Sequence, residues 1–305
     1  MNVLTVDHLR LGTEHGVPVK DVSFSVGEGE CVGIVGESGS GKSLTLRAIA
    51  GVLPVGVRVV SGEHDVNGRS AMVFQEPMTT LNPTMRVGEF IAEGPRARGV
   101  SKADSVRRAV ELLTEVGVPD PATRARAWPH QLSGGLRQRV MIAAALAVEP
   151  AILLCDEPTT ALDTTVQAQL LALVDRLRVE RGMSVVFVSH NLAVVSRVAQ
   201  RVIVMYAGRI VEAGPTSEIL HHPAHPYTQA LIAAIPTENE RAGDLTTIAG
   251  APPDASALIE GCSFAARCPL AQETCRTVLP PTVEVGRGHA AACHLVTPAD
   301  REVLV

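Results

Sequence analysis

Residues 36–43 have the composition of a loop that could bind phosphate. They read GESGSGKS and directly follow the apolar run Cys31–Val35. Glycine lets the backbone approach a ligand without a Cβ in the way, so successive N–H groups can surround phosphate oxygens. In the spacing G-x-x-x-x-G-K-S, Lys42 would reach the β- and γ-phosphates and the Ser43 hydroxyl would bind Mg²⁺. A flexible Gly/Ser loop is the alternative, but it needs neither the preceding apolar run nor the helical pattern of residues 44–50.

Two more apolar runs end at side chains that could do chemistry. Ala151–Cys155 leads into Asp156 and Glu157, and Val185–Val188 leads to His190. Such runs are typical of central strands in a parallel sheet that is covered on both faces, and the helical patterns between them indicate an α/β fold. Because ligands bind beyond the carboxyl ends of such strands, we expect the three polar ends to converge on one edge.

Together these groups are suited to phosphoryl transfer from ATP, which depends mainly on positioning and charge stabilisation. Asp156 could hold Mg²⁺ directly or through water, and Glu157 could act as general base on the attacking water. His190 could contact the γ-phosphate and respond to its loss. Each also has a plain structural interpretation. The two carboxylates could cap a helix or form a surface turn, and the histidine could be buried and hydrogen-bonded.

Residues 132–139, LSGGLRQR, predict the start of a helix. Ser133 is a typical N-cap residue, and Gly134 and Gly135 leave the N–H groups of the first turn uncovered. A bare helix N-terminus can bind an anion. A capped helix would explain the serine but not both glycines. The apolar positions expected along this helix are Leu136, Val140, Ala144 and Val148.

Composition limits the class of protein. The 305 residues are 46% hydrophobic and 19% charged, enough for one large or two modest domains. A net charge of −5 argues against a nucleic-acid partner. No run approaches the ~18 apolar residues of a membrane span, and no secretory signal is visible, so we expect a cytoplasmic protein without structural disulfides. A solvated or partner-facing surface is expected for the arginines at 96, 98, 107, 108, 124 and 126.

The motifs resemble those of the ATP-binding subunits of ABC transporters. GESGSGKS resembles the Walker A loop, LSGGL the signature motif, and Ile152–Glu157 the Walker B strand with its catalytic glutamate. Residues 161–163 are similar to the D-loop, Gln75 to the Q-loop glutamine and His190 to the switch histidine. All six occur in the family's order over residues 30–190.

The resemblance implies an ABC-type nucleotide-binding domain over residues 1–235. It would have a P-loop parallel sheet core, an antiparallel β part and a helical subdomain at about 76–150. ATP and Mg²⁺ are the implied cofactors, with Glu157 and His190 catalytic and Mg²⁺ bound through Ser43, Gln75 and Asp156. The implied contacts to ATP phosphates come from Gly36, Glu37, Ser38, Gly39, Ser40, Gly41, Lys42, Ser43, Gln75, Ser133, Gly134, Gly135 and Asp163.

The implied site is shared between two subunits. Ser133, Gly134 and Gly135 would bind the γ-phosphate of the nucleotide held by a partner subunit, either a second copy or a sibling. One departure concerns adenine, because the family usually stacks an aromatic residue of the first strand on it and residues 9–12 read LRLG. Leu11 or Val17 could offer an apolar contact instead.

Three stretches resemble the oligopeptide/dipeptide importer branch, namely VFQEPMTTLNPTMRVGE (73–89), WPHQLSGG (128–135) and HPYTQALIAAIP (225–236). The resemblance implies ATP-driven import of peptides at the cytoplasmic face of the cell membrane. Its partners would be a second ATP-binding subunit, two integral membrane permease subunits that dock on residues 76–100 and, indirectly, an extracytoplasmic solute-binding protein. The branch also includes subunits for nickel and other small solutes.

Two other classes of protein remain as alternatives. A soluble ABC ATPase without a membrane partner usually has a long coiled-coil insertion or two fused nucleotide domains, and neither is visible here. A regulatory module that binds ATP without hydrolysis would not need both Glu157 and His190.

Residues 236–305 differ from the rest, because prolines interrupt any periodicity. We expect a small irregular C-terminal domain with four cysteines separated by gaps of five, six and seventeen residues, too wide for a C-x-x-C zinc ribbon. Four thiolates suit an iron–sulfur cluster or Zn²⁺. The resemblance implies a [4Fe–4S] cluster, with Zn²⁺ or free thiols as alternatives. The ligands would be Cys262, Cys268, Cys275 and Cys293. Cys31 and Cys155 are expected to be buried, and His289 and His294 to lie at the surface.

Overall fold

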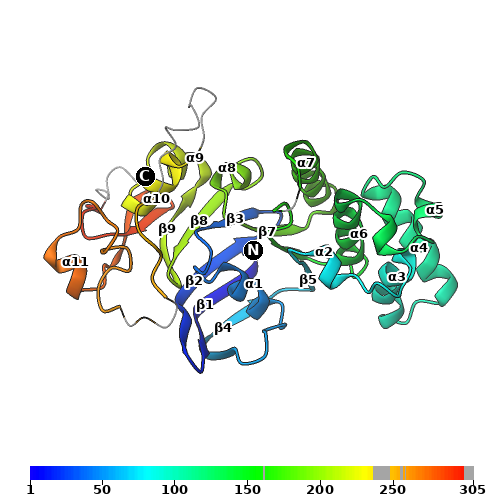
Figure 1. Ribbon diagram of the computed structural model, residues 1–305, viewed down its shortest axis with the longest axis horizontal. Coiled ribbons are helices and arrows are strands. Elements are labelled where there is room, and N and C mark those ends of the chain that lie inside the picture. The colour runs from blue at the N-terminus through cyan, green and yellow to red at the C-terminus, as the bar shows by residue number, and fades with distance from the viewer. Residues whose placement is uncertain (161, 236–247, 255–256, 258, 299–305) are drawn as a thin grey trace. The chain divides into compact units, whose positions relative to one another are not determined.

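The computed structural model describes residues 1–160, 162–235, 248–254, 257 and 259–298 (Figure 1). By their internal contacts these residues form two compact units, each assembled from separate stretches of chain. The first unit comprises Met1–Leu4, Val26–Glu30 and Val66–Val186. The second unit comprises Thr5–Ser25, Cys31–Asp65 and the described part of Phe187–Val305. The domains expected from the sequence, residues 1–235 and 236–305, are defined by motifs rather than by internal contacts. They stay a prediction.

The first unit is mainly helical. In α4 the Ser101 side chain accepts a hydrogen bond from the N–H of Asp104, and the helix buries Leu112 and Leu113. Strands β5 and β6 are parallel, with Val73 paired to Cys155. Its elements are β5 (Ser70–Val73), α2 (Pro77–Thr80), α3 (Val87–Ala97), α4 (Lys102–Glu115), α5 (Pro121–Arg124), the 3₁₀ helix η1 (Pro129–Gln131), α6 (Gly134–Leu146), β6 (Ile152–Asp156) and α7 (Thr164–Arg181).

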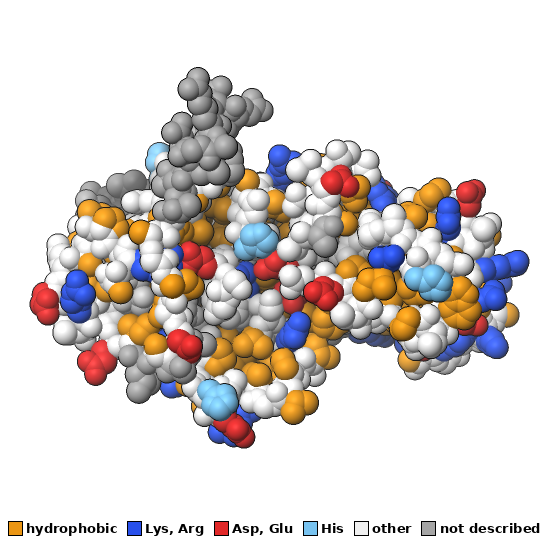
Figure 2. Space-filling view, in the orientation of Figure 1, with side chains coloured by type: hydrophobic (Ala, Val, Ile, Leu, Met, Phe, Trp, Pro, Cys, Tyr) orange, Lys and Arg blue, Asp and Glu red, His pale blue; other side chains and the backbone are white. Residues whose placement is uncertain are grey.

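Arginines are concentrated on the helices of this unit. Figure 2 shows Lys and Arg side chains gathered where Figure 1 draws α4 and α5. Of the six arginines expected at a solvated or partner-facing surface, three are exposed and three are half-buried. The exposed ones are Arg98, Arg107 and Arg126, and the half-buried ones are Arg96, Arg108 and Arg124.

The second unit contains a mixed sheet in the order β4-β1-β2-β9-β8-β3. Strand β8 is parallel to β3, with Ile34 paired to Ile203, and antiparallel to β9. Its strands are β1 (Asn2–Thr13), β2 (Gly16–Gly27), β3 (Cys31–Val35), β4 (Arg58–Val66), β8 (Arg201–Tyr206), β9 (Arg209–Pro215), β10 (Thr282–Gly286) and β11 (His289–Ala292). Its helices are α1 (Lys42–Ile49), α8 (Leu192–Val195), α9 (Thr216–His221), α10 (Pro226–Ala233) and α11 (Glu273–Thr277). The predicted α/β class, with parallel and antiparallel parts, is confirmed.

The three strands predicted to end at candidate site residues are present and fully buried. β3 has the predicted bounds, β6 begins and ends one residue later than predicted, and β7 (Ser184–Ser189) is one residue longer at each end. β7 runs from the first unit into the second. Cys31 and Cys155 are buried in these strands, as expected. No helix among the described residues is long and apolar enough to cross a membrane.

The C-terminal extension is less irregular than predicted. Strands β10 and β11 form an antiparallel hairpin, and β11 pairs with β9 so that Ala291 lies opposite Glu212 (Figure 1). The extension therefore adds strands to the sheet of the second unit. It also corrects one expectation. His289 is not at the surface, because its side chain is 4% exposed and its Nε2 lies 2.7 Å from Oε1 of the fully buried Glu212.

Two buried titratable groups lie beside this hairpin. Burial lowers the pKa of His225 to about 4, although the charge of Glu212 opposes the shift. Burial raises the pKa of Glu212, but hydrogen bonds from His289 and from the N–H groups of Ala224 and His225 lower it more. The Nδ1 atom of His225 accepts a hydrogen bond from the N–H of Tyr227 and so caps α10.

Both shifts predict that acid destabilises the protein. As pH falls from about 6.5 to about 4, the unfolded chain binds a proton at His225 that the folded chain does not bind. Stability is therefore lost in that pH range. Glu212 adds a loss as pH falls through its lowered pKa. His225→Asn keeps a capping acceptor but cannot titrate. We expect it to reduce the drop in unfolding free energy between about pH 7 and about pH 4 by about 3 kcal/mol, measured by urea unfolding.

The matched control is His222→Asn, since His222 is exposed. It should reproduce the pH dependence of the unchanged protein. Equal pH dependence in His225→Asn and the unchanged protein would contradict the assignment.

Candidate functional site

The loop at residues 36–43 joins β3 to α1, and two of its glycines are required by geometry. A Cβ on Gly36 would lie 2.1 Å from the carbonyl oxygen of Met205, which no side chain tolerates. Gly41 caps α1 with φ 97°, a conformation that favours glycine, and its carbonyl accepts the N–H of Thr45. The loop is thus fixed by close backbone packing rather than flexible, and the N-terminus of α1 opens directly onto it.

Lys42 lies across this loop and is 4% exposed. Its Nζ donates to the carbonyls of Gly36 at 2.7 Å and Glu37 at 2.9 Å, and lies 3.3 Å from Oγ of Ser40. These contacts hold the ammonium over the loop, as the phosphate interpretation requires.

His190 directly follows β7 and is exposed, so it is not the buried histidine of the alternative interpretation. The next residue, Asn191, caps α8 by accepting the N–H of Ala193. Helix α8 packs closely on β3, because a Cβ on Gly33 would lie 1.9 Å from Cγ1 of Val195. The second unit therefore carries both the loop and His190.

Asp156 is the last residue of β6 in the first unit, and Glu157 directly follows it. Asp156 is fully buried. Glu157 has φ 46°, a left-handed conformation that costs about 1 kcal/mol for a residue with a Cβ. Its Oε2 accepts a hydrogen bond from the Thr160 hydroxyl at 2.8 Å. Neither carboxylate caps a helix, because α7 begins at Thr164 and its N-cap is Asp163. Non-glycine residues in this conformation are concentrated at functional sites.

Gln75 lies at the same sheet edge as these carboxylates. It and Glu157 each follow the paired residues Val73 and Cys155 by two positions. Gln75 also lines a hollow of about 340 Å³ with Gly134 and Pro158. The structure thus brings together the predicted Q-loop, the start of the signature helix and the segment after Glu157.

Ser133 caps α6 as predicted, with its hydroxyl accepting the N–H of Leu136 at 3.4 Å. Ser133 and Gly134 are exposed, so they are available to a partner. A Cβ on Gly135 would lie 2.7 Å from Cγ1 of Val166 on α7, whereas one on Gly134 would meet only Leu162 at 3.8 Å. Packing therefore accounts for Gly135 but leaves Gly134 unexplained.

The apolar pattern predicted for this helix is partly wrong. Helix α6 ends at Leu146, so Val148 lies beyond it, and Leu136 and Ala144 are only half-buried. Instead the helix is buried on several sides, through Gln138, Val140, Met141, Ile142, Ala143, Ala145 and Leu146.

Asp163 has a structural contact besides its predicted one. As the N-cap of α7, it accepts the N–H of Val166 through Oδ1 at 2.9 Å. The preceding D-loop residue 161 lies outside the described residues.

The site residues thus form two groups. The second unit holds Gly36–Ser43 and His190, and the first unit holds the predicted Walker B, Q-loop, signature and D-loop residues. Their convergence on one edge stays a prediction. Of the two substitutes for an adenine-stacking residue, Leu11 is excluded because it is fully buried. Val17 is half-buried.

The four cysteines of the extension are all free of disulfides. The N–H of Cys262 donates to the carbonyl of Cys275 at 2.8 Å. Burial, and after it the charge of neighbouring cysteines, raises the pKa of both Cys262 and Cys293. The sulfurs therefore lie near one another. Among the described residues, however, no three His, Cys, Asp or Glu side chains form a group that could hold a metal ion. The predicted cluster, or Zn²⁺, is not supported by these positions.

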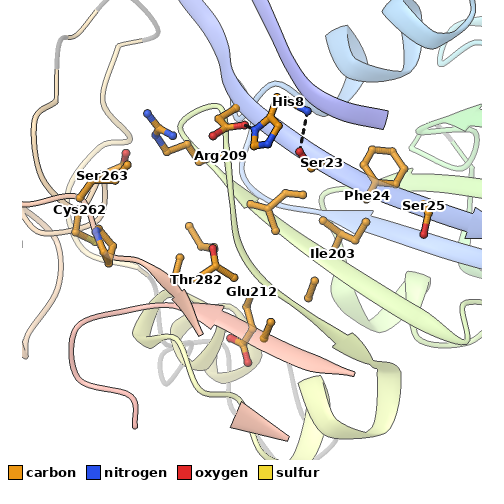
Figure 3. A pocket seen from close by; sticks show the side chains of 18 of the residues that line it. His8, Ser23, Phe24, Ser25, Ile203, Arg209, Glu212, Cys262, Ser263 and Thr282 are labelled. Atoms are coloured by element: carbon orange, nitrogen blue, oxygen red, sulfur yellow. Dashed lines mark hydrogen bonds and ion pairs between the residues drawn. The ribbon is translucent and has the colours of Figure 1, made fainter. Parts of the chain in front are cut away.

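A hollow of about 580 Å³ lies elsewhere in the second unit (Figure 3). His8 and Ser23 line it from the first strands, Ile203 and Arg209 from β8 and β9, and Cys262 from the extension. It contains no predicted phosphate-binding residue, so it is not part of the candidate site.

Sequence reasoning missed two residues that touch the loop. Arg267 forms an ion pair with Glu37, and the Tyr227 hydroxyl accepts the N–H of Glu37. No local motif marks them, because they lie 230 and 190 residues from Glu37 along the chain.

Comparisons with known proteins agree with this geometry. A model of the ABC transporter family matches residues 19–160, and a model of the oligopeptide/dipeptide transporter C-terminal region matches residues 211–275. The dipeptide transport ATP-binding protein DppD of Escherichia coli is 42% identical over 316 residues, covering 96% of this chain and 97% of that protein. A relative from Brucella melitensis, named for peptide import and ATP binding, is 46% identical over 307 residues and 91% of each chain.

A solved structure is similar as well. A dimeric ATP-binding cassette in a post-hydrolysis state, bound to ADP and Pi, matches with a TM-score of 0.61 and 28% identity over 70% of this chain and 98% of that one. The chain belongs to the ATP-binding subunits of ABC transporters, and it is an ATPase of that family. Within the family it belongs to the oligopeptide/dipeptide branch. The resemblance drawn from the motifs is confirmed.

The packing of Gly135 can be tested by substitution. In Gly135→Ala the new methyl meets Val166, so we expect a loss of about 1–3 kcal/mol in unfolding free energy, measured with urea. Adding Val166→Ala removes the obstructing atom and should restore most of the loss.

Gly134→Ala is the control, with an expected cost below about 1 kcal/mol. If both alanines cost the same, or if Val166→Ala gives no recovery, the packing explanation is wrong.

Proposed function

We propose that this ATPase powers the import of dipeptides or oligopeptides through a membrane ABC transporter. The observation that carries the proposal is the match over almost the whole chain to a dipeptide transport ATP-binding protein, joined to the C-terminal match to oligopeptide/dipeptide transporters. As a subunit without a membrane-crossing helix among its described residues, it would bind to the cytoplasmic face of the membrane.

The positions described above support the following residue roles. Lys42 would neutralise the β- and γ-phosphates, and the first N–H groups of α1 would donate to them. Hydroxyl, amide and carboxylate oxygens are the ligands that Mg²⁺ prefers, and Ser43, Gln75 and Asp156 supply one of each. When bound, Mg²⁺ would neutralise phosphate charge. Glu157 would orient and deprotonate the attacking water, and the exposed His190 would contact the γ-phosphate.

A dimer would complete the site. Ser133 and Gly134, at the start of α6, are exposed, so the nucleotide of a partner subunit could be bound at this helix N-terminus. A sheet edge and a helix N-terminus from different subunits would then hold one nucleotide, and its charge would draw the two subunits together. The partner is either a second copy or a sibling subunit.

The permease subunits would dock on residues 76–100. Two features support this surface. Met78 is an exposed large apolar side chain at the start of the range. The hollow beside it extends from Gln75 to the signature helix. Binding in that hollow would therefore affect both the predicted Mg²⁺ ligands and the surface that a partner's nucleotide would contact.

Glu157→Gln separates binding from hydrolysis. The amide keeps the size of the side chain but cannot accept a proton from water, so we expect ATP hydrolysis to fall about 100-fold or more while ATP is still bound. The protein should then remain dimeric with MgATP in light scattering.

Glu63→Gln, at an exposed position of β4, is the matched control and should hydrolyse ATP at the normal rate. Normal hydrolysis by Glu157→Gln would show that another group is the base.

The cargo is tested by transport. The subunit is reconstituted in vesicles with the permease subunits and solute-binding protein that co-purify with it, and ATP-dependent uptake of a dipeptide is compared with uptake of Ni²⁺. Peptide uptake supports the proposal. Uptake of Ni²⁺ alone would show that the ATPase powers nickel import instead. Failure to co-purify with any integral membrane subunit favours a soluble ATPase.

The cysteine site is the finer part of this proposal. Its support is the four-thiol pattern and the proximity of the neighbouring sulfurs, which help to raise the pKa of Cys262 and Cys293. If a [4Fe–4S] cluster is bound, protein prepared without oxygen should contain about four iron atoms per chain and absorb near ~400 nm, and Cys268→Ser should lose both signals. Zinc in place of iron indicates the alternative metal. Absence of both metals indicates free thiols.

A further inference from the structure

The second residue of the phosphate loop is held by the C-terminal extension. Nη1 of Arg267 lies 2.6 Å from Oε2 of Glu37, and Nη2 lies 2.9 Å from Oε1. This is a bidentate guanidinium–carboxylate pair, the geometry in which such pairs are strongest and most directional. Both residues belong to the second unit.

The pair is fixed on the arginine side. The Arg267 side chain is 6% exposed. Its Nε donates to the carbonyl of Ala249 at 2.8 Å, Nη2 to the carbonyl of Ile248 at 3.2 Å, and Nη1 to the Tyr206 hydroxyl at 3.2 Å. The hydrogen bonds to Glu37 raise the pKa of Arg267, so the charge is permanent. These hydrogen bonds hold the Arg267 side chain in one orientation. The ion pair in turn holds the carboxylate of Glu37.

A tyrosine holds the backbone of the same residue. The N–H of Glu37 donates to the hydroxyl of Tyr227 at 2.8 Å. Tyr227 is fully buried and packs against Tyr206 and Phe264, with ring centroids 4.6 and 5.3 Å away. These are both tyrosines of the chain and one phenylalanine of the extension. Burial raises the pKa of Tyr227, so its hydroxyl stays neutral.

The third contact of Glu37 leads to the predicted phosphate ligand. Its carbonyl accepts a hydrogen bond from Nζ of Lys42 at 2.9 Å. Glu37 is therefore tied by its carboxylate, its N–H and its carbonyl at once. A shift of Glu37 would move both a loop N–H group and the ammonium that is expected to reach the phosphates.

We propose that Arg267 and Tyr227 are positioning residues of the nucleotide site, which hold Glu37 and through it Lys42 in the arrangement that binds ATP. The extension is then a working part of the ATP site, and its packing sets nucleotide affinity. The inference rests on the proposed role of Gly36–Ser43 in phosphate binding.

The test measures nucleotide affinity in the full chain. MgADP binding is followed by titration calorimetry, and KM and kcat for ATP are measured in parallel. Arg267→Ala should weaken MgADP binding about tenfold and raise KM accordingly, with kcat changed by less than about twofold. Arg267→Lys should recover part of the loss, because it keeps the positive charge but cannot form the bidentate pair. Arg276→Ala, an exposed arginine of α11, is the matched control and should bind normally.

A double-mutant cycle shows whether Arg267 acts through Glu37. Glu37→Gln should weaken binding in the same direction, and the double variant should be no weaker than Arg267→Ala within about twofold. Tyr227→Phe, which deletes one oxygen, should also raise KM. Should Arg267→Ala fail to fold, Glu37→Gln and Tyr227→Phe carry the test.

Two outcomes overturn the inference. One is normal MgADP affinity in Glu37→Gln and Tyr227→Phe. The other is fully additive losses in the cycle, which would mean that Arg267 acts elsewhere. An unchanged protein that binds no MgADP would instead overturn the proposed nucleotide site itself.

Discussion

The shape of the phosphate loop depends on backbone atoms that are held from several sides. The carbonyl of Met205 leaves no room for a side chain at Gly36, and the N–H of Gly208 donates to the carbonyl of Ser40 at 3.1 Å. Lys42 binds two loop carbonyls from within. A loop rich in glycine would lose much conformational entropy on ordering, so these external contacts are what make an ordered cradle possible.

The proposed general base is held differently. Glu157 directly follows the fully buried strand β6 and takes a left-handed conformation that is uncommon for residues with a Cβ. The strand fixes its position, and the Thr160 hydroxyl fixes its carboxylate. Strain of about 1 kcal/mol is small beside the packing of β6, so the fold can maintain it at Glu157.

The C-terminal extension is integral to the second unit. Its strand β11 pairs with β9, and His289 compensates the buried carboxylate of Glu212. A buried carboxylate without such partners would be costly, and the small Gly214 lets the imidazole approach. The same extension supplies Arg267 to the phosphate loop. The sheet of the second unit and the loop at residues 36–43 are therefore both held by contacts from the extension.

The family and the local elements could be read from short-range patterns in the chain. Short buried strands, glycine spacing and helix caps are local patterns, so β3, β6, β7, the cap at Ser133 and the family could be predicted without coordinates. The residues that support those motifs could be identified only from the three-dimensional packing. Three contacts join positions that are far apart in sequence. They are the ion pair of His289 with Glu212, the close packing of Gly135 on Val166, and the ion pair of Arg267 with Glu37. No local pattern encodes such contacts, because they arise when separate strands and helices bring their side chains within reach of one another.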